Sequence, residues 1–89
     1  MENVPRIKFT APNHCIITVG KERYFQSYES IVAKQDSTGK YTLGQHWDYS
    51  PTTLRHLYAD FLPSYIGTSK LEIIKAIKDG TVIYDHNLI

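Results

Sequence analysis

The chain has 89 residues, enough for one domain. Its apolar fraction of 42% and charged fraction of 21% are typical of a folded globular protein and exclude disorder of the whole chain. Ten Lys and Arg residues against nine Asp and Glu residues give a net charge of +1, which argues against a DNA mimic and against a strong overall field for nucleic acid. The single cysteine, Cys15, excludes an internal disulfide and a zinc site built on cysteines.

The N-terminus and the short apolar runs predict the cellular location of the protein. Residues 1–6 contain no basic region followed by an apolar run, as a signal peptide would. The apolar runs are a few residues long, far short of the ~20 residues that span a bilayer. We therefore expect a cytoplasmic protein without a membrane partner, folded as one domain over residues 1–89.

The first half of the chain predicts strands separated by turns. Residues 6–11 alternate polar and apolar side chains, and later segments are rich in β-branched residues. Residues 27–29 are expected to be irregular, and the break in alternation over residues 25–28 indicates a bulge, a feature that often redirects side chains at edges or sites. The predicted strands are residues 6–11, 14–19, 22–26, 30–35 and 40–44, with a short final strand at 81–84.

A change of period after residue 50 predicts a first helix. Ser50 is a typical N-cap and Pro51 suits the first helical position, while Pro63 ends the helix. One apolar face recurs at helical spacing and consists of Leu54, Leu57, Tyr58, Phe61 and Leu62.

A second helix is predicted to begin after Ser69. Ser69 and Glu72 have the spacing of a capping box, and Gly80 is the left-handed residue expected just past the end. We expect a core stripe, flanked by Ile73 and Ala76, that consists of Leu71, Ile74 and Ile77.

The order of these elements predicts the fold class. Strands, then two helices, then one strand indicate an α+β fold with the order β-β-β-β-β-α-α-β. We expect an antiparallel β-sheet of about five to six strands with two helices packed on one face. The free edges of such a sheet also make a homodimer a hypothesis to test.

The residue types that could carry chemistry do not form a catalytic or metal-binding pattern. His14, His46, His56 and His86 lack the spacing of a metal site. A nucleophile could be imagined from Ser27 or Ser50 with His46 or His56, but no nucleophile elbow is present and Ser50 is needed as a cap. Residues 39–42 suit a hairpin better than a phosphate loop. We expect no enzyme, no cofactor and no metal.

Residues 47–53 form the segment richest in candidate functional groups. In the structural interpretation, which we favour, Trp47 or Tyr49 packs over the sheet while Ser50 caps the helix. In the functional interpretation, the helix start binds an anion and the aromatic rings stack a base. The same two interpretations apply to residues 25–28, again with the structural one favoured.

Basic residues lie at several predicted edges. Arg6 and Lys8 share one side of the first strand, Lys21 and Arg23 lie near a hairpin tip, and the second helix carries Lys70, Lys75 and Lys78. We favour solvated edges, which resist aggregation, over a nucleic-acid surface.

Several motifs resemble a family of small uncharacterised proteins from phages and plasmids of Gram-positive bacteria. The resemblance covers residues 22–84 and rests on the pattern FQSYxSIxA…WDYSxTT…FL, with the first motif starting at Phe25 and the second at Trp47. The family carries no assigned activity. The resemblance implies an origin in a mobile element, whose small proteins often bind and block a host protein, as anti-CRISPR and other anti-defence proteins do.

Three functions follow as hypotheses. The leading one is a non-enzymatic accessory protein of a phage or mobile element that binds and modulates a host protein, with an anti-CRISPR-like inhibitor as one version. Seven tyrosines support it, because Tyr is favoured at interfaces. The alternatives are a binder of single-stranded nucleic acid, and a small hydrolase or nuclease that uses His46, Asp48 and His56. The expected contact residues of the leading hypothesis are Tyr24, Tyr28, Tyr49, Arg55 and Tyr65.

Overall fold

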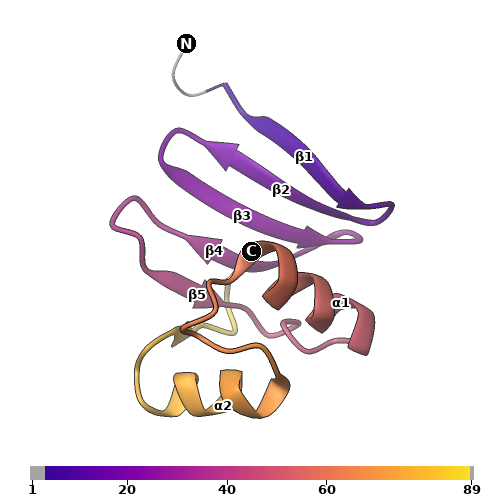
Figure 1. Ribbon diagram of the computed structural model, residues 1–89. Helices are drawn as coiled ribbons and strands as arrows, with labels where there is room; N and C mark the ends of the chain where they lie inside the picture. The colour runs from indigo at the N-terminus through magenta and orange to yellow at the C-terminus, as the bar shows by residue number, and fades with distance from the viewer. Residues whose placement is uncertain (1–3, 89) are drawn as a thin grey trace.

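A six-stranded sheet with the strand order β1-β2-β3-β4-β5-β6 is the frame of the protein in the computed structural model, which describes residues 4–88 (Figure 1). Each of the strands β1 to β5 is antiparallel to its neighbour, and β6 joins β5 in parallel. The predicted α+β fold and its element order are therefore confirmed. The strands are β1 (Arg6–Ala11), β2 (His14–Val19), β3 (Glu22–Ser27), β4 (Ser30–Gln35), β5 (Tyr41–Leu43) and β6 (Ile83–Tyr84).

A bulge interrupts the pairing of β3 with β4. Phe25 pairs with Ala33 and Gln26 with Ile31, so Val32 is the extra residue. The bulge predicted over residues 25–28 therefore lies at Phe25 and Gln26, but its extra residue is on the facing strand β4. The irregularity predicted at residues 27–29 is the turn between β3, which continues through Ser27, and β4. Because of the bulge, the consecutive residues Val32 and Ala33 are both buried.

The first helix begins at Pro51 and changes its winding at residue 57. The α-helix α1 (Pro51–His56) is followed by one turn of π-helix, η1 (Leu57–Phe61), in which the Leu62 N–H donates to the Leu57 carbonyl at 2.9 Å. Sequence periodicity predicts a single continuous helix, since it does not distinguish a wider turn from an ordinary one. The wider turn leaves the neighbours Phe61 and Leu62 both buried. The predicted cap is confirmed, because the Ser50 hydroxyl accepts the Thr53 N–H at 3.1 Å.

The second helix, α2 (Lys70–Lys78), is rotated from the predicted orientation. Leu71, expected in the core stripe, is 78% exposed, whereas the expected flanking residues Ile73 and Ala76 are buried. Ile74 and Ile77 pack partly against the core. The prediction was wrong because two overlapping stripes have helical spacing in this segment. The stripe with Ile73 is the buried one, on the side where Gly67 lies close to the backbone of Glu72 and Ile73.

The N-terminus of α2 also departs from the predicted capping box. The Ser69 hydroxyl accepts the Glu72 N–H at 3.3 Å, as expected. The Glu72 carboxylate accepts instead from the Thr68 N–H at 2.7 Å, one residue before the cap. The reciprocal hydrogen bond therefore anchors the incoming loop to the helix.

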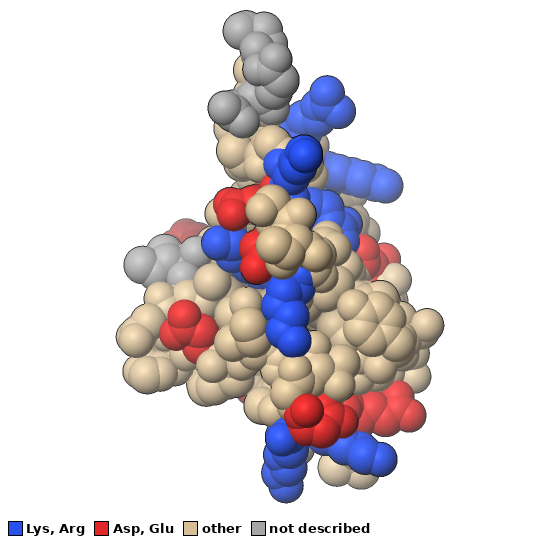
Figure 2. All heavy atoms as spheres, turned by 90° about the vertical axis from the view of Figure 1, so that its left-hand side faces the viewer, with Lys and Arg blue, Asp and Glu red and all other residues tan. Residues whose placement is uncertain are grey.

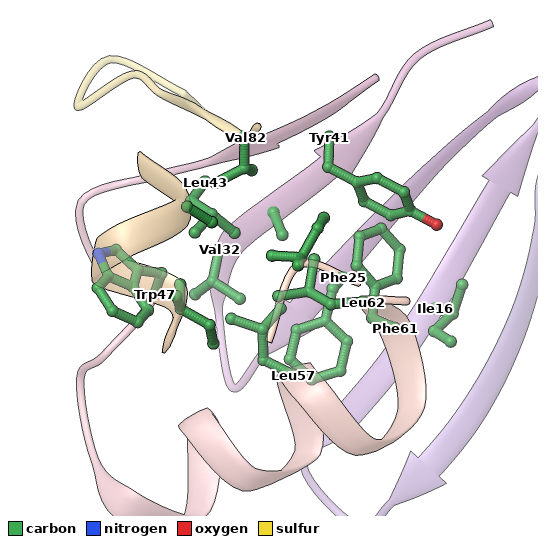
Figure 3. Close-up of a cluster of buried hydrophobic side chains, with 14 residues drawn as sticks. Ile16, Phe25, Val32, Tyr41, Leu43, Trp47, Leu57, Phe61, Leu62 and Val82 are labelled. Atoms are coloured by element: carbon green, nitrogen blue, oxygen red, sulfur yellow. The ribbon is translucent and has the colours of Figure 1, made fainter. Parts of the chain in front are cut away.

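One core joins the sheet to both helices. In Figure 3, side chains from β3 and from the first helical segment point toward one another, and the rings of Phe25 and Phe61 lie 5.8 Å apart. Both helices contribute to this core on one face of the sheet, with α2 beside β5 and β6 (Figure 1). Within residues 4–88, no helix is long and apolar enough to cross a membrane. The buried apolar residues of the core are Ile16, Phe25, Val32, Ala33, Tyr41, Leu43, Trp47, Leu57, Phe61, Leu62, Ile66, Ile73, Ala76 and Val82.

Candidate functional site

A groove of about 690 Å³ lies between the β3–β4 turn and the loop that leads into α1. Residues 27–30 form one side, and residues 46–50 form the other. The two segments that the sequence singled out, one at each motif, therefore meet at one site. We call it the tyrosine groove, and its lining residues are Asn13, Ser27, Tyr28, Glu29, Ser30, Val32, His46, Tyr49 and Ser50.

Three hydroxyl groups connect the two sides of the tyrosine groove. The Ser27 hydroxyl lies 2.9 Å from that of Thr53, and both side chains are buried. The Ser50 hydroxyl donates to the Thr53 hydroxyl at 3.1 Å. These bonds tie the end of β3 to the start of α1, and they give each buried hydroxyl group a hydrogen-bond partner.

Tyr28 projects from a backbone in the left-handed region. It is the one residue other than glycine with a positive φ, at 55°, in the described chain. The Tyr28 N–H donates to the Asn13 carbonyl at 2.7 Å, and the Gln26 side-chain amide donates to the Tyr28 carbonyl at 2.7 Å. Such a conformation costs of order 1–3 kcal/mol, and surrounding bonds must hold it. The backbone of Tyr28 is thus held in place, and its side chain, 53% exposed, lines the groove.

Tyr49 comes from the opposite side, in a loop anchored by Trp47. Trp47 is buried in the core, whereas Tyr49 is 71% exposed. The Tyr49 N–H donates to the His46 carbonyl at 3.1 Å, and the two rings meet edge to face at 6.0 Å. Of the two aromatic residues considered for packing over the sheet, Trp47 is the one that does so, and Tyr49 is left for the groove.

A buried histidine lies next to Tyr28. The His14 ring meets the Tyr28 ring edge to face at 5.7 Å and stacks on the His56 ring at 4.6 Å. Neither ring nitrogen of His14 has a hydrogen-bond partner among residues 4–88. Burial lowers the pKa of His14, and a charge on His56 lowers it further, against a smaller opposite effect of Asp60. His14 is therefore a neutral, mainly packing side chain near neutral pH.

The structure brings together two of the five tyrosine and arginine residues proposed as contacts. Tyr28 and Tyr49 share the tyrosine groove. Tyr65, 69% exposed, lines a separate hollow of about 320 Å³ beside α2. Arg55 is exposed on α1. Tyr24 is half-buried, and its hydroxyl donates to the Glu22 carboxylate at 2.9 Å, so it lies on the strand face opposite to that of Phe25.

The sequence pattern did not indicate the contribution of the turns to the groove. Asn13 and Glu29 line the groove because the β1–β2 and β3–β4 turns lie at the same end of an antiparallel sheet. The alternation of strand direction is a signal that could have placed them there.

His46, Asp48 and His56, the residues of the enzyme hypothesis, each contact a residue outside that set. His46 contacts Tyr49, and Asp48 pairs with Lys70 at 3.4 Å. The His56 Nδ1 atom lies 3.0 Å from the Asp60 carboxylate. Ser27 bonds to Thr53 and Ser50 caps α1. Within the described residues, no three His, Cys, Asp or Glu side chains form a group that could hold a metal ion.

The basic residues differ in their surroundings. Arg6 and Lys8 are exposed, as are the three lysines of α2. Arg23, interpreted from the sequence as a solvated edge residue, is half-buried instead: its guanidinium donates to Gln35 at 2.7 Å and to the Tyr41 hydroxyl at 3.1 Å. The same group lies 4.8 Å from the centre of the Phe61 ring. Arg23 therefore stabilises the core edge through a cation–π contact and hydrogen bonds.

Comparison with known proteins identifies a family. A family model described as a family of unknown function (DUF8033) matches residues 4–76, which include every residue that lines the tyrosine groove. No curated protein and no solved structure matches the chain.

Proposed function

The chain belongs to DUF8033, a family of unknown function, and we propose that it is a non-enzymatic module that binds another protein through the tyrosine groove. One observation carries this proposal: Tyr28 and Tyr49, both exposed, reach the same groove from two segments that hydroxyl bonds hold together. The arrangement presents two large side chains at a fixed spacing.

Tyrosine rings at such positions are suited to binding. A tyrosine buries a large area with few rotatable bonds, and its hydroxyl can remain hydrated. Hydrogen bonds hold the Tyr28 backbone and the His14 ring contacts its side chain, and this partial ordering reduces the freedom that is lost on binding. A groove that is preorganised in this way favours recognition of an extended segment or loop of a partner protein.

The charges of the groove favour a protein over a nucleic acid. Glu29 and His46 lie in its lining, and neither Lys nor Arg is among the described residues that line it. Nucleic-acid binding depends on basic side chains that neutralise phosphates. Asn13, Ser30 and His46 instead offer donors and acceptors that suit the backbone of a polypeptide.

The biological setting is part of the same proposal. We propose an accessory protein of a phage or mobile element that works in the cytoplasm of a host bacterium and modulates a host protein, with an anti-CRISPR-like inhibitor as one version. The resemblance of the two motifs to small phage and plasmid proteins supports this setting. Both motifs contribute a tyrosine to the groove.

The test is capture of partners from a nuclease-treated lysate of a Gram-positive host with the tagged protein and three variants. Tyr28→Asn removes the ring and keeps a residue that tolerates the left-handed backbone, and Tyr49→Ala removes the other ring. Tyr65→Ala is the matched control, since it removes an equally exposed tyrosine outside the groove.

We expect a stoichiometric protein partner that both groove variants lose and the control retains. Capture of a partner that all three variants retain would contradict the groove as the binding site. Recovery of oligonucleotides without nuclease, lost with nuclease, would support the nucleic-acid alternative instead.

A further inference from the structure

The strand β1 forms an open edge of the sheet. It pairs with β2 on one side, and its other side has no neighbouring strand in the described chain. The pairing is regular from Arg6 to Phe9 and is interrupted by a bulge between Phe9 and Ala11. The regular part thus offers a short row of unpaired backbone donors and acceptors, which can template another strand.

The two faces of this edge have different chemistry. Arg6 pairs with Thr18 and Lys8 with Ile16, so both basic residues lie on the face that carries the helices. Ile7 pairs with Ile17 and Phe9 with Cys15 on the opposite face. Ile7 is 59% and Phe9 67% exposed, an unusual exposure for large apolar side chains next to each other on one strand face.

Basic side chains are present at this end of the molecule. Figure 2 shows several of them over the upper part of the molecule, where β1 and the neighbouring strands lie in Figure 1, while other Lys and Arg side chains lie lower down and Asp and Glu side chains lie among them. The edge therefore combines positive charge on one face with apolar surface on the other.

We propose that the β1 edge binds an extended strand of a partner protein in which acidic and apolar residues alternate. The acidic side chains would lie opposite Arg6 and Lys8, and the apolar ones would cover Ile7 and Phe9. Directly opposed residues are the unit of stabilisation between strands, and opposite charges are favoured there. This surface is separate from the tyrosine groove, so the inference does not depend on the proposed function.

A second copy of the chain fits this edge less well. In an antiparallel pair of β1 strands centred on Ile7, Lys8 faces Arg6 of the second copy, and in one centred on Lys8 the two Lys8 side chains face each other. Like charges directly opposite each other destabilise a sheet. A pair centred on Phe9 runs into the bulge. Charge complementarity thus selects an acidic partner strand.

The experiment is selection of a displayed library of random octapeptides on three immobilised proteins: the wild type, the Arg6→Glu/Lys8→Glu variant, and a Lys75→Glu/Lys78→Glu variant with the same change of net charge on α2. The selected peptide is then synthesised and titrated against each protein by fluorescence anisotropy. Amide chemical shifts of the wild type locate the bound peptide.

We expect the wild type and the α2 variant to enrich peptides with acidic residues at every second position and apolar residues between them. The Arg6→Glu/Lys8→Glu variant should bind the selected peptide roughly tenfold more weakly or worse, and added salt should weaken wild-type binding. The shifted amides should lie in residues 6–9.

Three results would overturn the proposal. They are enrichment without alternating acidic residues, equal affinity of the selected peptide for the Arg6→Glu/Lys8→Glu variant, and shifted amides at the tyrosine groove. A wild-type dimer in light scattering, with β1 amides protected from exchange in the dimer, would assign the edge to a second copy and would also overturn it.

Discussion

The hydroxyl groups of Ser27 and Thr53 lie 2.9 Å apart in the protein interior, although the residues are 26 positions apart in the sequence. Ser27 is the last residue of β3, and Thr53 lies in the first turn of α1. Their contact fixes the distance between the segments that carry Tyr28 and Tyr49.

Thr53→Val should destabilise the protein by about 1–3 kcal/mol, because it preserves the side-chain shape but leaves the buried Ser27 hydroxyl without a partner. Urea unfolding measures the change. The control is the double variant Ser27→Ala/Thr53→Val, which removes the Ser27 hydroxyl as well and should recover part of the loss, while the half-buried Ser50 hydroxyl loses its Thr53 acceptor in both variants. A single variant as stable as the wild type would show that this hydrogen bond contributes nothing.

Stability should fall when the pH drops below the ordinary His14 pKa of 6.5. Burial and His56 lower the His14 pKa in the folded protein, so between the lowered value and 6.5 the unfolded chain binds the proton more readily. The loss from this group is at most about 1.4 kcal/mol per pH unit, and it ends below the lowered pKa. Above pH 6.5 the group has no effect.

The measurement is urea unfolding between pH 5 and pH 8 for the wild type and for His14→Phe. Phenylalanine retains an aromatic ring against Tyr28 and Phe25 but does not titrate. The variant should show a shallower pH dependence, and identical profiles would exclude His14 as its source.

Ile73→Ala should cost about 2–5 kcal/mol, as expected for a fully buried isoleucine that leaves a cavity. Leu71→Ala, two positions earlier on the same helix, should change stability by less than about 0.5 kcal/mol because Leu71 is exposed. Thermal unfolding of the two variants measures the loss of stability in each. Equal losses would mean that α2 is rotated toward the stripe predicted from the sequence.

Gly67→Ala should destabilise the protein more than Gly39→Ala. Both glycines have positive φ, at 149° and 91°, so alanine is strained at either position. A Cβ atom at Gly67 would also lie 2.7 Å from the Glu72 Cβ, whereas nothing lies within 4 Å of one at Gly39. Urea unfolding measures the loss of stability in both variants, and the difference reports on the contact with Glu72. Equal losses would argue against close packing of the loop on α2.

Local patterns in the sequence account for most of the fold. Alternation, turn residues and the Ser50–Pro51 start predict the strands and the first helix, because period and capping are properties of adjacent residues. These local patterns do not predict which of two apolar stripes of α2, the one with Leu71 or the one with Ile73, is buried. They also do not predict the π-helical turn at Leu57–Phe61. In both places the choice depends on which neighbours pack against the helix.

The candidate site, like the fold, could be predicted from the sequence only in part. The sequence alone identified the two motif segments and their tyrosines as candidates for binding, from composition and from the break in alternation. Only the tertiary structure decided that Tyr28 and Tyr49 share a groove while Tyr24 lies on another face and Trp47 is buried. The physical reason is that strand register, the bulge at Val32 and the bond between Ser27 and Thr53 join residues far apart in the chain, and such pairings arise from the packing of the whole domain.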